Sequence, residues 1–351
     1  MKSRQPKKFL IFYILDILRK YTDENHRLSQ KEIGNLLKSR YEMIVDRKSI
    51  KTNLMDLIEL GFDIEYGETV RMVKNRKTGE IEESYILSDF YMRHEFTDAE
   101  LRLLIDGLLF SRHIPYRQCR ELVGKLEGLS SDYFLSRMKH IATMPEDRTD
   151  NKQIFYNIAI LDEAISHNRK VQFKYVEYDI DGKQHIKTRA DGTERIYVVS
   201  PYQMAAKEGK YYLICNYDKY EDISNYRLDR IVEIELLDDK AKPFHDLKGA
   251  NGQNLNLSDY MKEHVYMYSS NTTRVQLRVV NAMISDVIDL FGTDVRFSDK
   301  NETHVTVSVK ANEIAVLQFA KNYAPDVVVL EPQEMREKAI ADLQKGLAGY
   351  Q

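Results

Sequence analysis

The middle of the chain consists of short extended segments separated by turn signals. Alternating or apolar runs occur at 171–175, 196–199, 210–215 and 232–236. Asp-Gly and Glu-Gly pairs, which favour tight turns, separate them at 181–182, 191–192 and 208–209. About five strands within roughly 70 residues predict a small β-barrel over residues 165–245. Such a barrel is too small to enclose a large cavity, so a ligand would bind on its surface or at an interface.

Length and composition set the outer limits. A chain of 351 residues with 43% hydrophobic residues is long enough for two or three domains with cores of their own. The formal net charge of −3 gives no global signal for binding a polyanion. Residues 1–87, however, contain 17 Lys and Arg against 14 Asp and Glu, a local charge of +3, so the remainder carries −6. Contact with nucleic acid is therefore expected at the N-terminal end.

The sequence contains no pattern typical of a metal centre or a catalytic site. Cys119 and Cys215 form no CxxC pair, and the nine histidines lack the spacing of metal ligands. No nucleophile with a base, pair of acids or metal cluster occurs at a recognisable spacing. We therefore expect no enzyme, no metal and no cofactor, and a reducing, cytoplasmic environment for the cysteines.

The first apolar run imitates a secretory signal, because basic residues precede residues 9–15. Asp16 interrupts the run, no small-residue cleavage site follows, and the run is too short to span a bilayer. Apolar side chains instead recur at helical spacing through Leu10, Ile14, Ile17, Leu18 and Tyr21. We expect a helix of a soluble protein and no membrane partner.

Two further short helices follow the first. Ser29 and Glu32 form a capping box that starts the second helix. Asp46 can cap the third helix, which carries an apolar stripe and ends at Gly61. Polar and basic side chains near its N-terminus lie away from or beside that stripe, as in the recognition helix of a helix-turn-helix. These residues are Arg47, Lys48, Ser49, Lys51 and Thr52.

Extended sequence after Gly61 predicts a basic hairpin, or wing, with strands in residues 62–66, 70–73 and 85–87. Its cations could clamp a phosphate backbone beside the third helix. They are Arg71, Lys74, Arg76 and Lys77. Taken alone, the wing could be a solvated hairpin with ordinary surface charge. Because it directly follows the helix-turn-helix, we predict a winged helix-turn-helix DNA-binding domain over residues 1–93, with Ser29 and Gln30 also at the DNA.

The remaining segments complete an α+β multidomain chain. A second capping box at Thr97 and Glu100, followed by helical apolar spacing, predicts a helical connector over 94–164. Its apolar faces could be domain core or the seam of a dimer. Residues 273–330 follow the order βαββαβ, the ferredoxin-like plan, and a last helix is expected from Gln333 to about Tyr350. This C-terminal domain would cover 246–351.

Residues 196–231 combine hydroxyls, aromatic rings and guanidinium groups on neighbouring short strands. Such groups can stack on bases and bind phosphates or carboxylates in a planar, bidentate way. Arg227 and Arg230 could instead pair with acids such as Asp229, a surface contact that contributes little to stability. Tyr212 alternates with Leu213 along one strand, so some side chains should fill the barrel and others face outward. The segment suggests a sensor rather than a catalyst.

Three runs in this region resemble the WYL domain of bacterial transcriptional regulators. They are Val199-Ser200-Pro201-Tyr202, Gly209-Lys210-Tyr211-Tyr212-Leu213 and Tyr226-Arg227-Leu228-Asp229-Arg230-Ile231, with Tyr211 in place of the Trp of the name. The resemblance implies an Sm-like, SH3-type barrel that binds a nucleic-acid or nucleotide-like effector and controls an N-terminal winged helix. By motif position, the effector-binding residues would be Ser200, Tyr202, Tyr212, Tyr226, Arg227 and Arg230. Residues 324–332 and the following helix resemble the WCX extension of the same regulators.

Together these motifs predict a ligand-responsive, DNA-binding transcriptional regulator that acts as a homodimer in the bacterial cytoplasm. Its expected partners are double-stranded operator DNA and a nucleic-acid or nucleotide-like effector. Effector binding would change the relative placement of two winged helices and therefore operator binding. The alternative is a non-regulatory protein that binds RNA or single-stranded nucleic acid through the Sm-like barrel, which would not need a winged helix.

Overall fold

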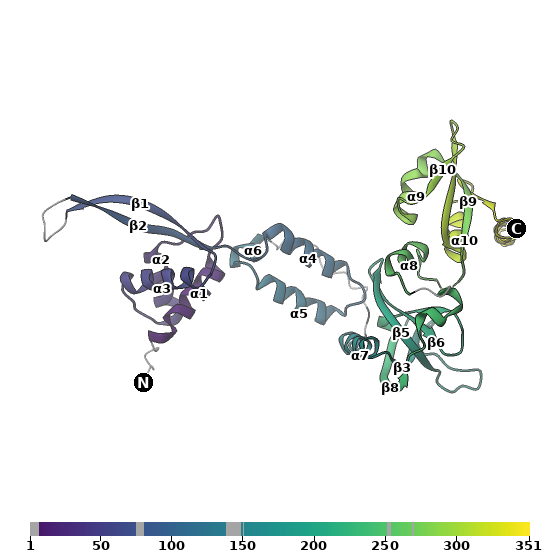
Figure 1. The fold of residues 1–351 in the computed structure, drawn as a ribbon, viewed down its shortest axis with the longest axis horizontal. Helices are drawn as coiled ribbons and strands as arrows, with labels where there is room; N and C mark the ends of the chain where they lie inside the picture. Colours follow the sequence, from purple (N-terminus) through teal and green to yellow (C-terminus); the bar gives the residue numbers. More distant parts are fainter. Residues whose placement is uncertain (1–6, 75–80, 138–148, 150, 251–253, 269) are drawn as a thin grey trace. The chain divides into compact units, whose positions relative to one another are not determined.

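The computed structural model describes residues 7–74, 81–137, 149, 151–250, 254–268 and 270–351 (Figure 1). The chain forms two compact units. The first consists of Met1–Ser111 with Tyr116–Asp147, and the second of Arg112–Pro115 with Arg148–Gln351. Both contain helices and antiparallel strands, as expected for an α+β multidomain protein. Among the described residues, no helix combines the length and the apolar character needed to cross a bilayer.

Three helices share one core at the start of the first unit: α1 (Leu10–Tyr21), α2 (Gln30–Tyr41) and α3 (Arg47–Glu59). Ser29 starts α2 through both halves of a capping box with Glu32. Asp46 starts α3 by accepting the backbone N–H of Ser49 at 2.9 Å. Side-chain caps therefore fix both helix starts, as the sequence predicts. Apolar residues at helical spacing fill the core, among them Ile14, Ile17, Leu18, Ile33, Leu37, Ile50, Leu54 and Leu57.

An antiparallel hairpin follows α3. Its strands β1 (Ile64–Lys74) and β2 (Ile81–Met92) pair along their length. The base of the hairpin is anchored to the helices, because Phe90 is buried in their core and exchanges backbone hydrogen bonds with Leu28 at 2.9 Å. The tip of the predicted wing, residues 75–80, lies outside the described residues.

Three more helices complete the first unit: α4 (Asp98–Phe110), α5 (Tyr116–Glu127) and α6 (Asp132–Arg137). Thr97 caps α4 in the predicted capping box with Glu100. Leu101, Ile105 and Phe134 form a small core of their own between these helices. The sequence analysis predicts α4 and α5 but not α6, which is too short to show helical periodicity.

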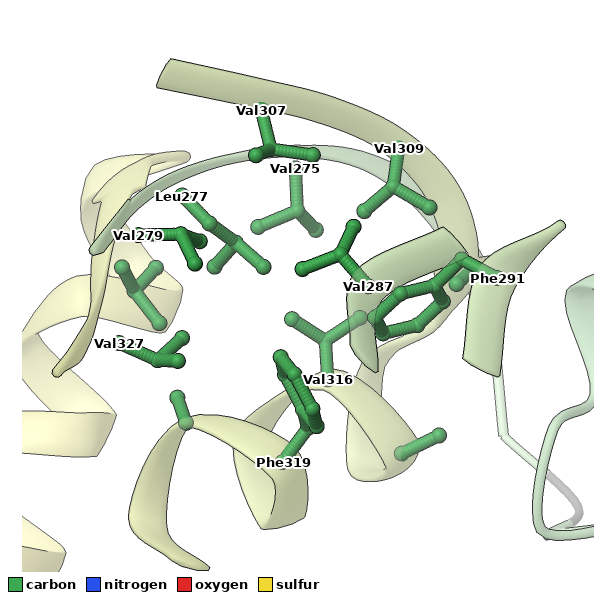
Figure 2. Packing of buried hydrophobic residues seen from close by; sticks show 14 of the residues in the cluster. Val275, Leu277, Val279, Val287, Phe291, Val307, Val309, Val316, Phe319 and Val327 are labelled. Carbon is green, nitrogen blue, oxygen red and sulfur yellow. The ribbon is translucent and has the colours of Figure 1, made fainter. Parts of the chain in front are cut away.

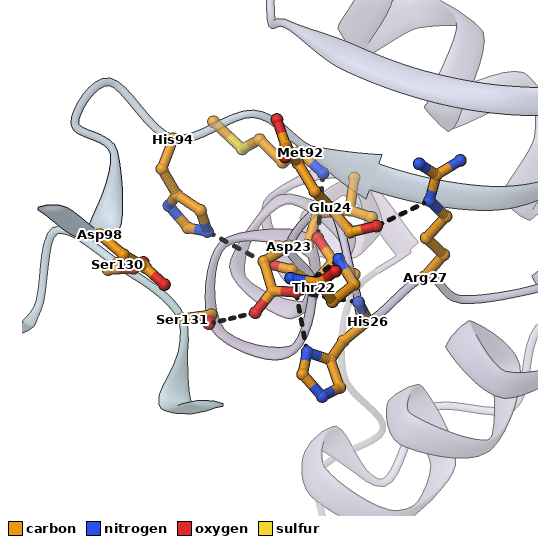
Figure 3. A network of polar contacts seen from close by, with 12 residues as sticks. Thr22, Asp23, Glu24, His26, Arg27, Met92, His94, Asp98, Ser130 and Ser131 are labelled. Carbon is orange, nitrogen blue, oxygen red and sulfur yellow. Dashed lines mark hydrogen bonds and ion pairs between the residues drawn. The ribbon is translucent and has the colours of Figure 1, made fainter. Parts of the chain in front are cut away.

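A polar network links the turn between α1 and α2 to the segments that follow it (Figure 3). The Asp23 carboxylate accepts the Ser131 hydroxyl at 2.9 Å and the backbone N–H of His26 at 2.9 Å. The Thr22 hydroxyl accepts the backbone N–H of Met92 at 3.0 Å. Burial alone would raise the pKa of Asp23, but hydrogen bonds from His26 and Ser131 outweigh it and lower that pKa. The network therefore holds the hairpin base and the start of α6 against the first helices.

The second unit begins with α7 (Ile154–Ser166), which packs on an antiparallel sheet. The strands of this sheet are β3 (Arg169–Tyr178), β4 (Gln184–Ile186), β5 (Ile196–Lys207), β6 (Lys210–Tyr217), β7 (Ile223–Arg227) and β8 (Ile231–Lys240). They pair in the order β4-β3-β5-β6-β7, and β8 also pairs with β3. Gly182, Gly192 and Gly209 have positive φ angles, so the predicted Gly turns are present.

Two features of this sheet differ from the sequence prediction. Strands β4 and β7 are not predicted, because their pairing depends on backbone hydrogen bonds to neighbouring strands and their side chains show no clear alternation. On β6, burial does not alternate either. Leu213 and Cys215 lie in the core between this sheet and α7, whereas Ile214 packs on the opposite side against Tyr260 and Met267. The outer face of β6 is therefore covered by another part of the chain.

The turn between β7 and β8 is a short 3-10 helix, η3 (Leu228–Arg230), held by two buried amides. Asn157 Nδ2 and Asn151 Nδ2 both donate to the carbonyl of Ile231, each at 2.8 Å. Asn151 Nδ2 also donates to the carbonyl of Asp229 at 3.1 Å. These amides satisfy backbone groups that would otherwise be buried without partners. They fix the backbone on which Arg227 and Arg230 are carried.

After α8 (Leu257–Glu263), the C-terminal part of the chain forms a sheet that is covered by helices. Its elements are β9 (Thr272–Val280), α9 (Ile284–Phe291), β10 (Arg296–Ser298), β11 (His304–Asn312), α10 (Glu313–Asn322), β12 (Val327–Glu331) and α11 (Gln333–Ala348). The strands pair in the order β10-β11-β9-β12, all antiparallel. Valines from the strands meet Val287 and Phe291 of α9 and Val316 and Phe319 of α10 (Figure 2).

We predict that Asn151→Ala and Asn157→Ala are coupled in their effect on stability. Each single variant leaves the Ile231 carbonyl one of its two amide donors, whereas the double variant removes both. The loss of local opening free energy in the double variant should therefore exceed the sum of the singles by about 1–3 kcal/mol. Native-state hydrogen exchange of residues 223–240 measures this free energy. Asp162→Ala, an exposed change on α7, is the control, and additive losses would contradict the shared-acceptor account.

Candidate functional site

Helix α3 presents a group of cations to solvent. Ile50, Leu54 and Leu57 bury its opposite face, while Arg47, Lys48, Lys51 and Thr52 are exposed. In the part of the chain that the structure describes, none of these three cations forms an ion pair with a carboxylate. Unpaired cations on the rigid face of a packed helix are available for phosphate oxygens.

The other polar residues predicted at this surface already have internal partners. The Ser49 hydroxyl donates to Asp46 at 2.8 Å, and the Thr52 hydroxyl donates to the carbonyl of Lys48 at 3.0 Å. Ser29 donates its backbone N–H and its hydroxyl to Glu32 at 2.7 Å. Gln30 Nε2 donates to the carbonyl of Leu87 on β2 at 3.0 Å. These side chains stabilise helix ends and the hairpin base, and their contact with DNA stays a prediction.

The predicted wing residues are only partly within the described structure. Arg71 is exposed on β1, and Lys74 ends that strand. Arg76 and Lys77 lie outside the described residues. Exposed apolar side chains also lie on the hairpin, a feature that the sequence analysis does not single out. They are Val70, Met72, Val73, Ile81, Tyr85 and Ile86.

Arg227 is already engaged in the second unit. Its Nε and Nη2 donate to the two carboxylate oxygens of Asp229 at 3.0 and 2.7 Å, and the Asp229 side chain is only 3% exposed. Burial alone would lower the pKa of Arg227, but the bond to Asp229 raises it. The alternative considered from the sequence, a structural pair with Asp229, is therefore present, but it is largely buried rather than on the surface. A ligand could use only the donors that Asp229 leaves.

Arg230 differs from Arg227 although both belong to the same run. Its Nε is buried and has no hydrogen-bond partner among the described residues, and its guanidinium carbon lies 5.9 Å from the ring centroid of Tyr178. A buried donor without an acceptor costs free energy unless a ligand or water supplies one. Arg230 is thus the predicted effector residue with the most available chemistry. Tyr178, its aromatic neighbour, is not predicted from the sequence.

Ser200 and Tyr202 both bind the backbone of Lys242, just after β8. The Ser200 hydroxyl accepts the Lys242 backbone N–H at 2.9 Å, and the Tyr202 hydroxyl donates to the Lys242 carbonyl at 2.8 Å. Ser200 is fully buried, and Tyr202 also packs edge-on against Phe244. Both side chains therefore have a structural use, and a role in effector binding stays a prediction.

Tyr226 lies in an aromatic cluster within the sheet rather than in an open pocket. Its ring centroid is 5.2 Å from Tyr175 and 5.4 Å from both Phe173 and Tyr197. Burial is the largest cause that raises the pKa of Tyr226. Tyr212 lies opposite Arg227 in the β6–β7 ladder and packs with the residues that cover the outer face of β6. These positions resemble those of packed core aromatics.

A large hollow of the second unit, about 1080 Å³, lies elsewhere. It is lined by β7, α8 and the start of β9, and none of the six predicted effector-binding residues lines it. Two of its lysines are paired, Lys262 with Asp294 and Lys310 with Glu263. Among the described residues, no group of three His, Cys, Asp or Glu side chains could hold a metal ion.

Comparison with solved structures aligns two proteins along almost the whole chain. Proteasome accessory factor B/C (PafBC) of Arthrobacter aurescens is 14% identical, with 99% of this chain and 49% of that chain aligned and a TM-score of 0.28. A CRISPR Cas-related protein is also 14% identical, with 100% of this chain and 87% of that chain aligned and a TM-score of 0.35. This chain thus spans about half the length of PafBC. Comparison with curated proteins gave no match.

Comparison with protein-family models gives one sequence-level assignment. Residues 156–236 match the WYL domain. The matched span runs from α7 into β8 and includes η3 with its two asparagine-bound carbonyls. It also contains all six residues predicted to bind an effector. Residues 196–231, whose side chains suggest a sensor, therefore lie within the span that is similar to a WYL domain.

Proposed function

We propose that this protein is a cytoplasmic, homodimeric transcriptional regulator that binds operator DNA through its first unit and an effector through its WYL-like segment. In this proposal it is a binding protein and not an enzyme. The observation that carries the DNA-binding part is the group of unpaired cations on α3, which stands on a packed three-helix core next to a hairpin. A winged helix-turn-helix has this order of elements.

The effector-binding part rests on the WYL match and on Arg230. Residues 156–236 are similar to the WYL domain, and among the described residues the buried Nε of Arg230 lacks an acceptor beside an aromatic ring. A nucleic-acid or nucleotide-like effector offers both a phosphate for the guanidinium and a ring for Tyr178. We infer that such an effector binds at Arg230 and changes the affinity for DNA.

The rest of the second unit fits the same proposal. The small antiparallel sheet around residues 169–240 supports an Sm-like, SH3-type barrel, and the strand order β10-β11-β9-β12 supports a ferredoxin-like, WCX-type C-terminal domain. A dimer would place two α3 helices on paired half-sites, and an effector that prefers one arrangement would shift the spacing.

The double variant Lys48→Ala/Lys51→Ala should bind double-stranded DNA more weakly. Each lysine is expected to neutralise one phosphate, so the slope of log affinity against log salt should become shallower by about 2. The probe is the set of genomic DNA fragments that the full-length protein retains at moderate salt, identified by sequencing. Fluorescence anisotropy across a salt series then measures the slope.

The matched control for this experiment is Arg120→Ala/Lys125→Ala, which removes two exposed cations from α5 in the same unit. Its DNA affinity and salt slope should equal those of the unchanged protein. If both double variants lose affinity equally, general charge rather than α3 binds the DNA. A retained set with no sequence preference would favour the non-regulatory nucleic-acid binder.

Arg230→Ala should leave DNA binding intact and abolish its response to the effector, because it removes the donor that lacks a partner. The probe is a short single-stranded oligonucleotide of mixed sequence, added while DNA affinity is measured. Arg227 is unsuitable for this test, since its removal would leave the buried Asp229 uncompensated, at a cost of about 3–5 kcal/mol. Arg336→Ala on α11 is the control. An oligonucleotide response that Arg230→Ala preserves would refute the assignment.

A further inference from the structure

A smaller hollow of about 440 Å³ adjoins the large one, and Lys219 lines both. It is lined by Thr188, Arg189, Ala190, Arg195, Tyr217 and Lys219. Three of these six side chains are cationic, and one is aromatic. None of them is among the residues predicted to bind an effector. The volume lies within the range of small-molecule sites.

The hairpin between β4 and β5 places the two arginines. The backbone N–H of Arg195 donates to the carbonyl of Lys187 at 2.8 Å, and that of Arg189 donates to the carbonyl of Thr193 at 2.7 Å. Asp191 accepts the backbone N–H of Thr193 at 2.9 Å, which closes the turn. Hydrogen bonds from Thr193 and, to a lesser degree, the nearby charge of Arg189 lower the pKa of Asp191. The Asp191 carboxylate is thus used by the turn.

Aromatic rings position the guanidinium of Arg195. Its central carbon lies 4.7 Å from the ring centroid of Tyr197 and 5.5 Å from that of Tyr217. Tyr217 and, to a lesser degree, Tyr220 also hydrogen-bond the Arg195 side chain, and the bond with Tyr217 is the largest cause that raises the pKa of Arg195. A guanidinium has five N–H donors, so an oxyanion would bind those that the tyrosines leave. Because the side chain is already held, little further rotamer entropy is lost when an anion binds.

The acids around the hollow are occupied by other cations. Glu194 pairs with Lys174, and Asp218 pairs with Lys170, each at 2.6 Å. Glu177 pairs with Lys187. Within the described ranges, no carboxylate forms an ion pair with Arg189, Arg195 or Lys219. Three cations line one hollow, and among the described residues only the Asp191 charge near Arg189 is seen to offset them in part. They favour a local positive potential in a chain whose net charge is negative.

A further ring, that of Tyr220, follows Lys219 in the chain and lines the neighbouring large hollow. Tyr220 is exposed, and its ring meets Tyr217 edge-on at 5.4 Å. Lys219 Nζ lies 5.9 Å from the Tyr220 ring centroid. A base that follows a phosphate could stack on this face, since stacking on tyrosine tolerates any base.

We propose that the hollow formed by Arg189, Arg195, Tyr217 and Lys219 is a binding site for the phosphate group of a nucleotide or of single-stranded nucleic acid. Arg195 binds two phosphate oxygens through its guanidinium edge, and Arg189 and Lys219 neutralise the remaining charge. Tyr220 stacks on the attached base. The site is separate from Arg230 and does not depend on DNA binding by the first unit.

Isothermal titration of the full chain with adenosine monophosphate, inorganic phosphate, adenosine and a five-nucleotide single strand tests this proposal. The phosphate-bearing ligands should bind and compete with one another, and adenosine should not. Arg195→Lys keeps the charge but loses the planar fork, and should weaken binding by at least about tenfold. Lys219→Glu, an exposed change that leaves the fold intact, should weaken it as well. Tyr220→Ala should weaken the nucleotide and the strand but not inorganic phosphate.

Two variants serve as controls. Arg296→Ala removes an exposed arginine from β10 and should bind like the unchanged protein. Arg230→Ala distinguishes the hollow from the proposed effector surface. The proposal would be overturned if Arg230→Ala lost nucleotide binding while Arg195→Lys and Lys219→Glu both kept it. It would also be overturned if adenosine bound as tightly as adenosine monophosphate. The proposal is supported if nucleotide binding is lost in Arg195→Lys and Lys219→Glu and kept in Arg230→Ala. This conclusion does not depend on whether these variants change the affinity for DNA.

Discussion

The turn between β7 and β8 in the second unit is held by one shared hydrogen-bond acceptor. The amides of Asn151 and Asn157 converge on the carbonyl of Ile231, the residue at which η3 passes into β8. These hydrogen bonds give the buried Ile231 carbonyl partners at the point where the chain turns. The side chains of Leu228 and Ile231 are buried at the same turn. The hydrogen bonds also fix the backbone that carries the two arginines. The backbone position of Arg227 and Arg230 therefore depends on these two amides. Asn157 lies on α7 and Asn151 lies just before it.

Arg227, Arg230 and Arg195 differ in whether a carboxylate forms an ion pair with the guanidinium. Arg227 compensates a buried carboxylate, so it belongs to the structure of the turn, and its removal would leave an uncompensated charge. Arg230 and Arg195 instead rest against tyrosine rings without a carboxylate partner among the described residues. Stacking holds a guanidinium in place while leaving its hydrogen-bond donors available. The same distinction applies in the first unit, where the polar side chains of α3 are used internally and its lysines are not.

Much of the local structure follows from the sequence. The capping boxes at Ser29 and Thr97 start their helices as predicted, because the bonding groups lie within four residues of one another. The short strands β4 and β7 do not follow from it, since their ladders depend on distant partners. Alternation on β6 also fails as a guide, because Tyr260 and Met267 cover the face expected to be exposed.

The sequence by itself determined the order of the longer helices and strands, the glycine turns and the candidate residues in the run from Tyr226 to Ile231. These depend on interactions between near neighbours, which the pattern of residues encodes directly. Only the tertiary structure decided which side chains remain available. Ser200 and Tyr202 bind the backbone of Lys242, and Arg227 binds Asp229. Among the described residues the Nε of Arg230 has no partner, whereas Arg195 is hydrogen-bonded to tyrosines and to no carboxylate. Whether a polar group is satisfied depends on residues that are distant in sequence and become neighbours only on folding.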